Sequence, residues 1–373
     1  MKFTPQDHLM MQRAIQLAKR GIYTTAPNPN VGCVLVKNGL IVGEGAHLKA
    51  GEPHAEVHAL RQASENAKGA TAYVTLEPCS HYGRTPPCAE GLIKAGVVKV
   101  ICAMVDPNPQ VAGRGLAMLE AAGIETASGL LETESRALNP SFLTRMETGK
   151  PFVQLKMAAS LDGKTALKNG VSQWITSKEA RQDVQRYRAQ AGAILSTAKT
   201  VIEDNASLNV RWSDLPSSIQ ESYLEAEVRQ PLRVILDRQH QLTSELALFN
   251  TTGKVVTVSH QPSHPLSHPE SHLYCDLDNN KQLVLSDVIQ KIAQEHNVNH
   301  LWVEAGATLA ASMICEGLVD ELIIYLAPKL MGADGRSIVN LIGLEAMSEA
   351  INLDISDIRM VGKDIRITAT IVR

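Results

Sequence analysis

The amino-acid sequence predicts a two-domain protein of the α/β class. At 373 residues the chain is longer than one hydrophobic core usually supports. Helical and extended apolar patterns alternate from residue 5 to about 130, and a second alternating series follows a Pro- and Gly-bracketed connection at 139–151. We place the boundary at Gly149, which gives predicted domains of 1–149 and 150–373.

The first domain is predicted to hold a mixed sheet between helix layers. Asn38-Gly39 is a typical two-residue hairpin turn, so the strands on either side of it should be antiparallel, whereas later strands are separated by helices. The expected order is a helix at 6–20, the hairpin, a helix from His54, a strand at 71–76, a helix after Pro87, a strand at 98–105 and a helix ending at Gly123.

The second domain is predicted to be a separate α/β unit built mainly on strands. Histidines recur every fourth residue from 260 to 272, but intervening prolines exclude a continuous helix, so we expect a loop there. The expected strands lie within 151–160, 191–202, 231–237, 253–260, 300–306, 323–330 and 365–372, with a helix between the strands at 300–306 and 323–330.

Composition narrows the functional class. A net charge of −3 and a pI near 6.5 provide no basic field for a nucleic-acid backbone. The N-terminus has no secretory pattern, and no apolar run is long enough to span a bilayer. We therefore expect a cytoplasmic enzyme of small molecules with no nucleic-acid or membrane partner, and we leave homo-oligomerisation open.

A zinc site is predicted in the first domain. His54 and Glu56 fall in the first turn of a predicted helix, Cys79 follows a strand, and Cys88 begins another helix. One imidazole and two thiolates leave a fourth position for water, which zinc activates as a nucleophile near neutral pH. Glu56 is then the proton shuttle, in the H-x-E and P-C arrangement of zinc nucleobase deaminases. The alternative is a closed structural site with His58 or His81 as the fourth ligand.

The motifs of this domain resemble the deaminase half of the bifunctional deaminase/reductase family of riboflavin biosynthesis. The resemblance rests on PNPNVGCVLV at 27–36, on HAE and on TLEPCSHYGRTPPC, in which eight residues separate the cysteines instead of the usual two. It implies a cytidine-deaminase-like α/β/α fold with a mixed sheet. The substrate-pocket residues implied by it are Asn28, His81, Arg84, Asp106 and Asn108, with Arg84 suited to a sugar phosphate. Asn28 and Asn108 also lie in Asn-Pro turns.

The second domain resembles the reductase half of the same family, which has a fold like dihydrofolate reductase and uses NADPH. A lysine-bearing strand at 151–160, the segment 171–177, and a strand, glycine turn and helix from about 300 carry this resemblance. No G-x-G-x-x-G Rossmann motif is present there. The implied NADPH contacts are Ala158, Trp174, Thr200, Asp204, Gly306, Ala307, Thr308, Leu309, Ala310, Ala311 and Ser312. The implied substrate contacts are Lys156, Ser172, Arg188, Leu208, Arg211 and Glu304, with both arginines suited to phosphate.

Two segments depart from the family pattern. Gly306-Ala307 stands where Gly-Pro is usual, and Asp204-Asn205-Ala206 where Asp-Pro or Asn-Pro is common. Independent of the resemblance, a phosphate contact at Arg188 and Arg211 is about as well supported as the alternative, in which they lie on a solvated helix face and at a strand end. The expected activity is hydrolytic deamination of 2,5-diamino-6-ribosylamino-4(3H)-pyrimidinone 5′-phosphate, then NADPH-dependent reduction of the ribosyl group. The rivals are a nucleobase- or tRNA-editing deaminase with an appended binding module, and a non-catalytic protein with a structural zinc.

Overall fold

The computed structural model describes residues 2–82, 86–109, 111–261 and 272–372. The chain folds as two compact units, Met1–Lys150 and Pro151–Arg373, and each is described by itself. In the described part of the chain, no helix has the length and apolar character needed to cross a membrane.

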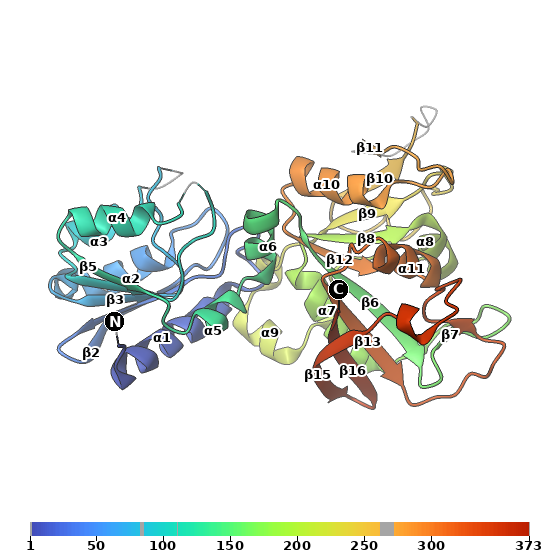
Figure 1. Cartoon of the computed structure of the whole chain (residues 1–373), viewed down its shortest axis with the longest axis horizontal. Coiled ribbons are helices and arrows are strands. Elements are labelled where there is room, and N and C mark those ends of the chain that lie inside the picture. Colours follow the sequence, from blue (N-terminus) through green and yellow to red (C-terminus); the bar gives the residue numbers. More distant parts are fainter. Residues whose placement is uncertain (1, 83–85, 110, 262–271, 373) are drawn as a thin grey trace. The chain divides into compact units, whose positions relative to one another are not determined.

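The N-terminal unit is built on a five-stranded mixed sheet (Figure 1). Asn38 and Gly39 both have positive φ, so they form the predicted hairpin turn between the first two strands. The first strand pairs antiparallel with its two neighbours, and the other pairs are parallel. The order is β2 (Leu40–Ala46), β1 (Gly32–Lys37), β3 (Thr71–Val74), β4 (Lys99–Cys102) and β5 (Glu125–Ser128).

Helices cover both faces of this sheet, as the sequence predicts. On one face α1 (Pro5–Ala18) packs Met11 and Ile15 against alternate strand residues. The other face is covered by α2 (Ala55–Ala63), α3 (Cys88–Lys94) and α4 (Arg114–Ala121), through a second buried cluster. Gly45 in β2 permits a close approach of α2, because a Cβ there would lie 2.0 Å from the Ala55 carbonyl oxygen. This contact fixes the first turn of α2 on the sheet.

The region 139–151 is where the sequence interpretation is wrong. We expected a connection, but α6 (Pro140–Thr148) occupies most of it, and α5 (Glu132–Arg136) precedes it. Asn139 at the N-cap, Pro140 in the first turn and Gly149 with positive φ at the end are helix-boundary signals. The same residue types punctuate linkers, which is why the sequence pattern is ambiguous.

The C-terminal unit is built on a nine-stranded sheet. Seven neighbouring strands run parallel, and the last two pair antiparallel at one edge. The order is β11 (His272–Tyr274), β10 (Val255–Ser259), β9 (Leu232–Leu236), β8 (Ala193–Thr197), β12 (His300–Glu304), β6 (Phe152–Ser160), β13 (Glu321–Ala327), β16 (Asp364–Ile371) and β15 (Leu353–Val361).

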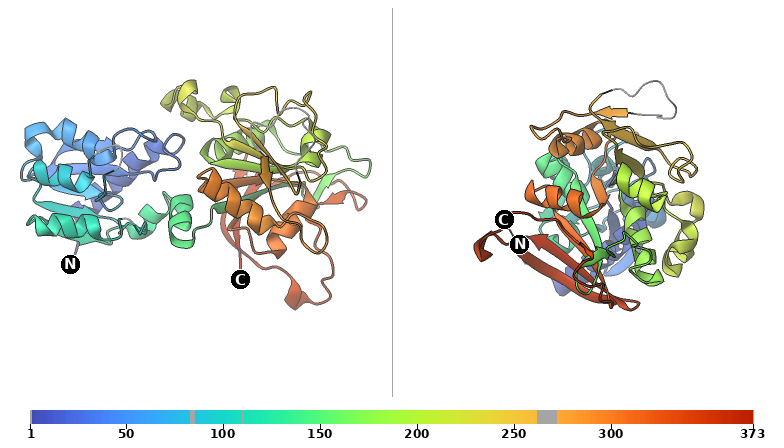
Figure 2. Two further views of the ribbon diagram at one scale, coloured as in Figure 1. Left: turned by 90° about the horizontal axis from the view of Figure 1, so that it is seen from above. Right: turned by 90° about the vertical axis from the view of Figure 1, so that its right-hand side faces the viewer.

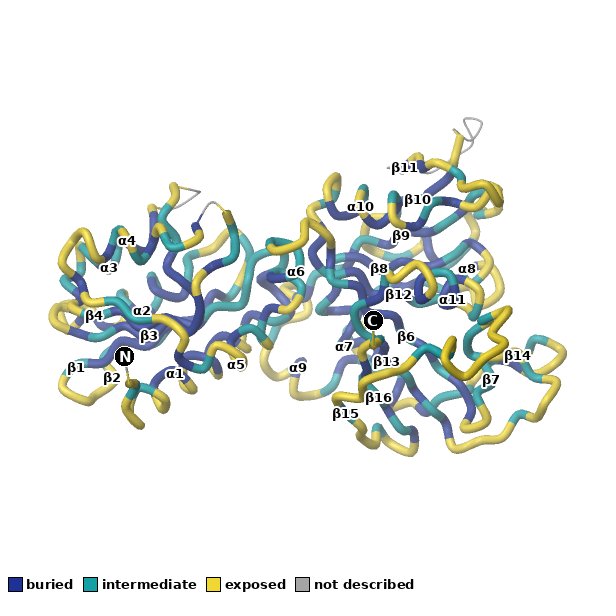
Figure 3. Tube along the Cα trace, viewed as in Figure 1, coloured by how far each residue is buried: buried dark blue, intermediate teal, exposed yellow. Residues whose placement is uncertain are grey.

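Two apolar layers cover the faces of this sheet, which confirms the predicted α/β class. On one face lie α10 (Leu285–Glu295) and α11 (Ala307–Cys315), and on the other α7 (Lys178–Gln190) and α8 (Ala198–Asp204). The right-hand view of Figure 2 separates the orange pair from the green pair. Figure 3 shows buried central strands and an exposed edge at β15.

Shorter elements complete the chain. His260 follows β10, His272 lies in β11 rather than in a loop, and His264 and His268 lie outside the described residues. The remaining elements are η1 (Lys19–Gly21), η2 (Ser64–Ala67), β7 (Lys164–Ala166), η3 (Trp212–Asp214), α9 (Ser217–Ser222), η4 (Glu225–Glu227), β14 (Arg336–Ser337) and η5 (Met347–Glu349).

Candidate active sites

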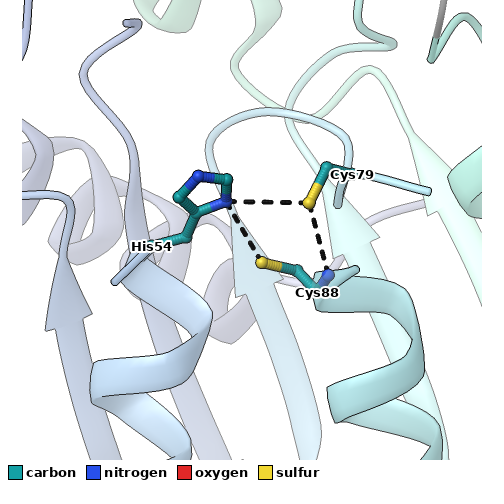
Figure 4. A group of neighbouring side chains, drawn as sticks. All are labelled: His54, Cys79 and Cys88. Atoms are coloured by element: carbon teal, nitrogen blue, oxygen red, sulfur yellow. Dashed lines mark hydrogen bonds between the residues drawn. The ribbon is translucent and has the colours of Figure 1, made fainter. Parts of the chain in front are cut away.

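Three side chains that could hold a metal ion meet above the sheet of the N-terminal unit (Figure 4). The Nδ1 atom of His54 lies 3.6 Å from Cys79 Sγ and 3.3 Å from Cys88 Sγ. All three ligand atoms lie within 4.8 Å of one another. Among the described residues, His54, Cys79 and Cys88 are the one set of three or more His, Cys, Asp or Glu side chains spaced closely enough to share a metal ion. Neither His58 nor His81 belongs to this set. The geometry therefore does not favour the closed-site alternative.

Three separate elements bring these side chains together. His54 is the N-cap residue of α2, Cys79 lies in the loop after β3, and Cys88 is the first residue of α3. The backbone N–H of Cys88 donates to the Cys79 sulfur at 3.3 Å. A helix N-terminus carries positive partial charge, so this contact stabilises a thiolate at Cys79.

The charges of the cluster suit a soft divalent cation. The pKa of Cys79 is lowered by its hydrogen bond with Cys88 and by contact with His54. Hydrogen bonding to Cys79 and burial both raise the pKa of Cys88. A hydrogen bond with Cys79 likewise raises the pKa of His54 to about 9. One nitrogen and two sulfur donors are the ligand set that zinc prefers.

Glu56 lies beside this cluster in the first turn of α2. Its side chain is 3% exposed, and burial raises the pKa of its carboxyl group although the charge of His54 opposes the shift. Its carboxyl group also contacts the Cys88 side chain. A buried carboxyl group with a raised pKa next to a candidate metal site is suited to accept and release a proton.

The other predicted pocket residues of this unit have different surroundings. Asn28 is half-buried, and its Nδ2 donates to His47 Nε2 at 3.2 Å. Asp106 is buried, accepts the Asn108 N–H at 2.8 Å and has its pKa raised to about 6 by burial. His81 is exposed, and Arg84 lies outside the described residues.

A second polar group lies inside the C-terminal unit. Glu304 ends β12 and pairs in register with Lys156 on β6. Arg188 from α7 donates to both Glu304 oxygens, Nε to Oε1 at 2.6 Å and Nη2 to Oε2 at 2.9 Å. Burial lowers the pKa of Lys156, while the charge of Glu304 opposes that shift. Arg188 is buried, so it does not lie on a solvated helix face.

Comparison with known proteins places both units in one family. Residues 4–104 match the cytidine and deoxycytidylate deaminase zinc-binding region, and residues 151–367 match the RibD C-terminal domain. The riboflavin biosynthesis protein RibD of Haemophilus influenzae is 53% identical, with 99% of each chain covered. That of Escherichia coli is 51% identical over 96% of this chain and 98% of its own. The chain belongs to the RibD family.

Solved structures of the RibD family agree over the whole chain. Acinetobacter baumannii RibD superposes with a TM-score of 0.90 at 44% identity, covering 99% of both chains. A Thermotoga maritima diaminohydroxyphosphoribosylaminopyrimidine deaminase/5-amino-6-(5-phosphoribosylamino)uracil reductase gives 0.84 at 31% identity, covering 98% of this chain and 99% of its own. The chain is thus a bifunctional deaminase and reductase of riboflavin biosynthesis, with a zinc-binding deaminase domain and a RibD reductase domain, which uses NADPH.

The residues assigned to NADPH by resemblance to the RibD family do not form one uniform surface. Ala158 lies two residues from Lys156 on the same face of β6, and Thr200 lies in the first turn of α8, where its hydroxyl contacts that of Thr197 at 3.0 Å. Asp204 ends α8. Trp174 is 63% exposed, and its carbonyl accepts from Lys329 Nζ at 2.6 Å.

The helix that follows the glycine turn divides into two parts. Gly306 is its N-cap residue, with Ala307 and Thr308 in its first turn. Asn340 contacts both, donating its N–H to the Ala307 carbonyl and its Nδ2 to Thr308 Oγ1. Ser312 is half-buried. The side chains of Leu309, Ala310 and Ala311 are buried and face the protein interior.

The remaining predicted substrate contacts in this RibD-family reductase unit lie in loops. Ser172 is half-buried, and Leu208 is buried with positive φ. Arg211 is exposed and is paired with Asp214 at 2.5 Å. Nε of Arg211 donates to Oδ2 of Asp214 in this contact. Arg211 therefore keeps part of its guanidinium group at the surface, unlike the buried Arg188.

Two residues of the RibD deaminase unit were not predicted from the sequence. His47 is buried, packs edge-on against the His54 ring at 5.3 Å between centroids, and joins His54 to Asn28. Glu77 is buried two residues before Cys79 and accepts backbone N–H groups from a distant loop. For Glu77 the sequence signal is a charged residue directly after an apolar strand. This is weak evidence, because strand ends often carry charges.

Proposed function

We propose that the N-terminal unit deaminates 2,5-diamino-6-ribosylamino-4(3H)-pyrimidinone 5′-phosphate and that the C-terminal unit then reduces the ribosyl group of 5-amino-6-(5-phosphoribosylamino)uracil. The activity named for the Thermotoga maritima relative supports the pair of substrates. The observation that carries the proposal for this chain is the meeting of His54, Cys79 and Cys88 next to buried Glu56. Both reactions use small molecules, and we propose the cytoplasm as their location.

The donor set supports zinc at His54, Cys79 and Cys88. Their three ligand atoms are close enough for one ion, and Cys79 has a lowered pKa, so a cation gains an anionic partner without deprotonating a normal thiol. Bound zinc supplies water activation near neutral pH. In this proposal the fourth position on zinc stays open for water. Glu56 does not fill it, because residues two apart in a helical turn point in different directions and Glu56 is two residues from the ligand His54.

Glu56 is the proposed proton carrier of the deaminase. Its carboxylate takes one proton from the attacking water and delivers it to the pyrimidine ring nitrogen. It then passes a second proton to the departing amino group, so water and the amine become a carbonyl oxygen and ammonia. Its burial raises its pKa towards the pH at which it must both accept and donate. Asn28, Asp106 and Asn108 are the proposed pyrimidine contacts, and His81 and Arg84, which lie between the two cysteines in the sequence, are also proposed to contact the substrate.

Lys156 and Glu304 form the proposed centre of the reductase. NADPH supplies the hydride that converts the ribosyl ring to a ribityl chain. Lys156 is a half-buried proton donor whose pKa is lowered by burial, and it pairs in register with Glu304 on the adjacent strand. The proposed NADPH contacts on this side are Ala158, Trp174, Thr200, Asp204 and the turn Gly306 to Thr308. Ser172, Leu208 and exposed Arg211 are the proposed loop contacts to the phosphorylated ribose.

Two variants and two assays test this division. Glu56→Gln should lower ammonia release from the diaminopyrimidine phosphate roughly 100- to 10,000-fold and leave zinc content and NADPH oxidation on the uracil substrate unchanged. Lys156→Met should lower NADPH oxidation on the uracil substrate and leave ammonia release and zinc content unchanged, since the substituted residue belongs to the second unit. If Glu56→Gln released ammonia at the normal rate, the deaminase assignment would be wrong. If the unaltered protein released ammonia without consuming NADPH, the reductase assignment would be wrong.

A further inference from the structure

The carboxylate of Glu77 joins two segments of the deaminase unit that are far apart in sequence. Glu77 lies after β3, and its side chain is 3% exposed. Oε2 accepts the backbone N–H groups of Asp106 at 3.1 Å and Gly113 at 2.9 Å. Oε1 accepts those of Gly115 at 2.8 Å and Leu116 at 3.2 Å. Four amide donors saturate the two oxygens of an ionised carboxylate.

All four donors come from the segment between the end of β4 and the first turn of α4. This segment, called here the 106–116 segment, carries Asp106 and Asn108; its residue 110 lies outside the described residues. The last donors belong to the N-terminal turn of α4, where a helix favours a negative charge. None of the four comes from His54, Cys79 or Cys88.

The backbone around Glu77 reinforces this connection. The Glu77 N–H donates to the Met104 carbonyl at 3.0 Å, just beyond β4. Gly115 lies directly against Pro78, since a Cβ at Gly115 would fall 1.9 Å from the Pro78 carbonyl oxygen. The strand end that leads to Cys79 and the 106–116 segment are therefore held together by a side chain and by a backbone contact.

We propose that Glu77 is a positioning residue of the deaminase, which fixes Asp106 and Asn108 beside the zinc site. Asp106 receives its orientation from both ends: its N–H is held by Glu77, and its Oδ1 accepts the Asn108 N–H at 2.8 Å. The inference rests on the proposed function, in which Asp106 and Asn108 contact the pyrimidine. Because the four hydrogen bonds that the Glu77 carboxylate accepts come from residues other than the metal ligands, its loss should affect substrate binding rather than zinc binding.

Glu77→Gln in the full chain is the main test. In this variant the side-chain NH₂ group of glutamine faces backbone N–H groups that donate to the carboxylate of Glu77. Donors then face donors, so the 106–116 segment should loosen. We expect the KM of deamination to rise at least tenfold, with one zinc per chain retained and NADPH-dependent reduction unchanged. Glu77→Asp keeps the charge but shortens the side chain, so it should give an intermediate KM.

Asp7→Asn is the matched control. Asp7 also holds the N-terminal unit together through a carboxylate, accepting from the Thr4 N–H and the Tyr73 hydroxyl, but it lies in α1 on the opposite face of the sheet. Asp7→Asn should lower the melting temperature without changing the KM. If Glu77→Gln lost stability like Asp7→Asn and kept its KM, or if it lost zinc, a positioning role would be refuted.

Two further outcomes are separable from these. Should Glu77→Gln fail to fold, Glu77→Asp decides, and an unaltered KM in that variant overturns the proposal. Failure of the proposed function shows itself differently, as an active Glu56→Gln variant. An unchanged KM in Glu77→Gln together with an inactive Glu56→Gln contradicts the role of Glu77 alone.

Discussion

Arg188 and Glu304 form a two-pronged ion pair inside the reductase unit, with both side chains about one-tenth exposed. Trp302 Nε1 adds a third hydrogen bond to Glu304 Oε1 at 2.9 Å, and Arg188 Nη1 donates to the Asn209 carbonyl at 3.0 Å. Burial alone would raise the pKa of Glu304, but the charge of Arg188 lowers it to about 2. We infer that Arg188 keeps Glu304 ionised and oriented, and that exposed Arg211 is better placed for a substrate phosphate.

Removing Arg188 should therefore damage the reductase unit selectively. Arg188→Ala leaves a buried carboxylate without its partner, which typically costs about 3–5 kcal/mol. We expect the free energy of unfolding of this unit to fall by that amount and NADPH oxidation to be lost, while ammonia release persists. Urea unfolding followed by tryptophan fluorescence reports on this unit alone, because all three tryptophans, Trp174, Trp212 and Trp302, belong to it.

Arg211→Ala provides the comparison for this variant. Its ion pair with Asp214 is exposed, so its removal should cost less than about 1 kcal/mol. If the two alanine variants unfolded at the same urea concentration, the Arg188–Glu304 pair would not have the importance assigned to it.

Zinc binding should depend on Cys88 but not on another buried cysteine of the same unit. Cys102 in β4 is fully buried and lies outside the cluster, so Cys102→Ala is a matched control for Cys88→Ala. We expect Cys88→Ala to lose its zinc and its ammonia release, and Cys102→Ala to retain one zinc per chain. A metal assay on the purified proteins decides. Equal zinc content in both variants would exclude Cys88 as a ligand, and chelator treatment of the unaltered protein should spare NADPH oxidation.

Local sequence signals were sufficient for part of the site and the fold. The turn Asn38-Gly39 specifies the hairpin through the φ values it requires, and Pro87 before Cys88 marks the start of α3. Those signals act over a few residues, so the hairpin, the start of α3 and the zinc ligand at that start can be predicted from the sequence alone.

The parts that the sequence did not reveal depend on contacts between distant residues. Glu77 bonds to amides 29 to 39 residues away, and Arg188 meets Glu304 across 116 residues. Backbone N–H donors leave no mark in the residue types that carry them. At 139–151 the signals are present, but Asn, Pro and Gly mark both helix ends and linkers, so the sequence predicts a connection where α6 forms.

Lys329 should influence NADPH binding through Trp174. Its Nζ donates to the Trp174 carbonyl at 2.6 Å, and the Arg181 guanidinium lies 4.4 Å over the Trp174 ring. Lys329→Met removes one charge-assisted hydrogen bond of an exposed segment, worth about 1 kcal/mol, which corresponds to about a fivefold change in binding. We expect the KM for NADPH to rise by about that factor with kcat unchanged. Lys254→Met, an exposed lysine elsewhere in the unit, should leave the KM unaltered, and equal values in both variants would count against the contact.

The stability of the reductase unit should fall on mild acidification because of His300. Burial lowers the pKa of this imidazole to about 4, and its Nε2 lies 2.7 Å from Gln154 Oε1. The folded pKa is below the unfolded value of 6.5, so the unfolded chain binds a proton first as the pH drops. The contribution is fully present above pH 6.5 and is lost between pH 6.5 and about 4, by up to about 3 kcal/mol.

His300→Gln tests this origin of the pH dependence, because glutamine can still donate to Gln154 but does not titrate. Urea unfolding between pH 7 and 4.5 should show a flatter decline for this variant than for the unaltered chain. The same exchange at His296, the C-cap residue of α10, is the control and should change the slope much less. Titrating groups that share no partner with His300, such as Asp183, contribute equally to both proteins and cancel in the difference. Parallel declines for His300→Gln and the unaltered chain would show that the His300 imidazole is not the group responsible.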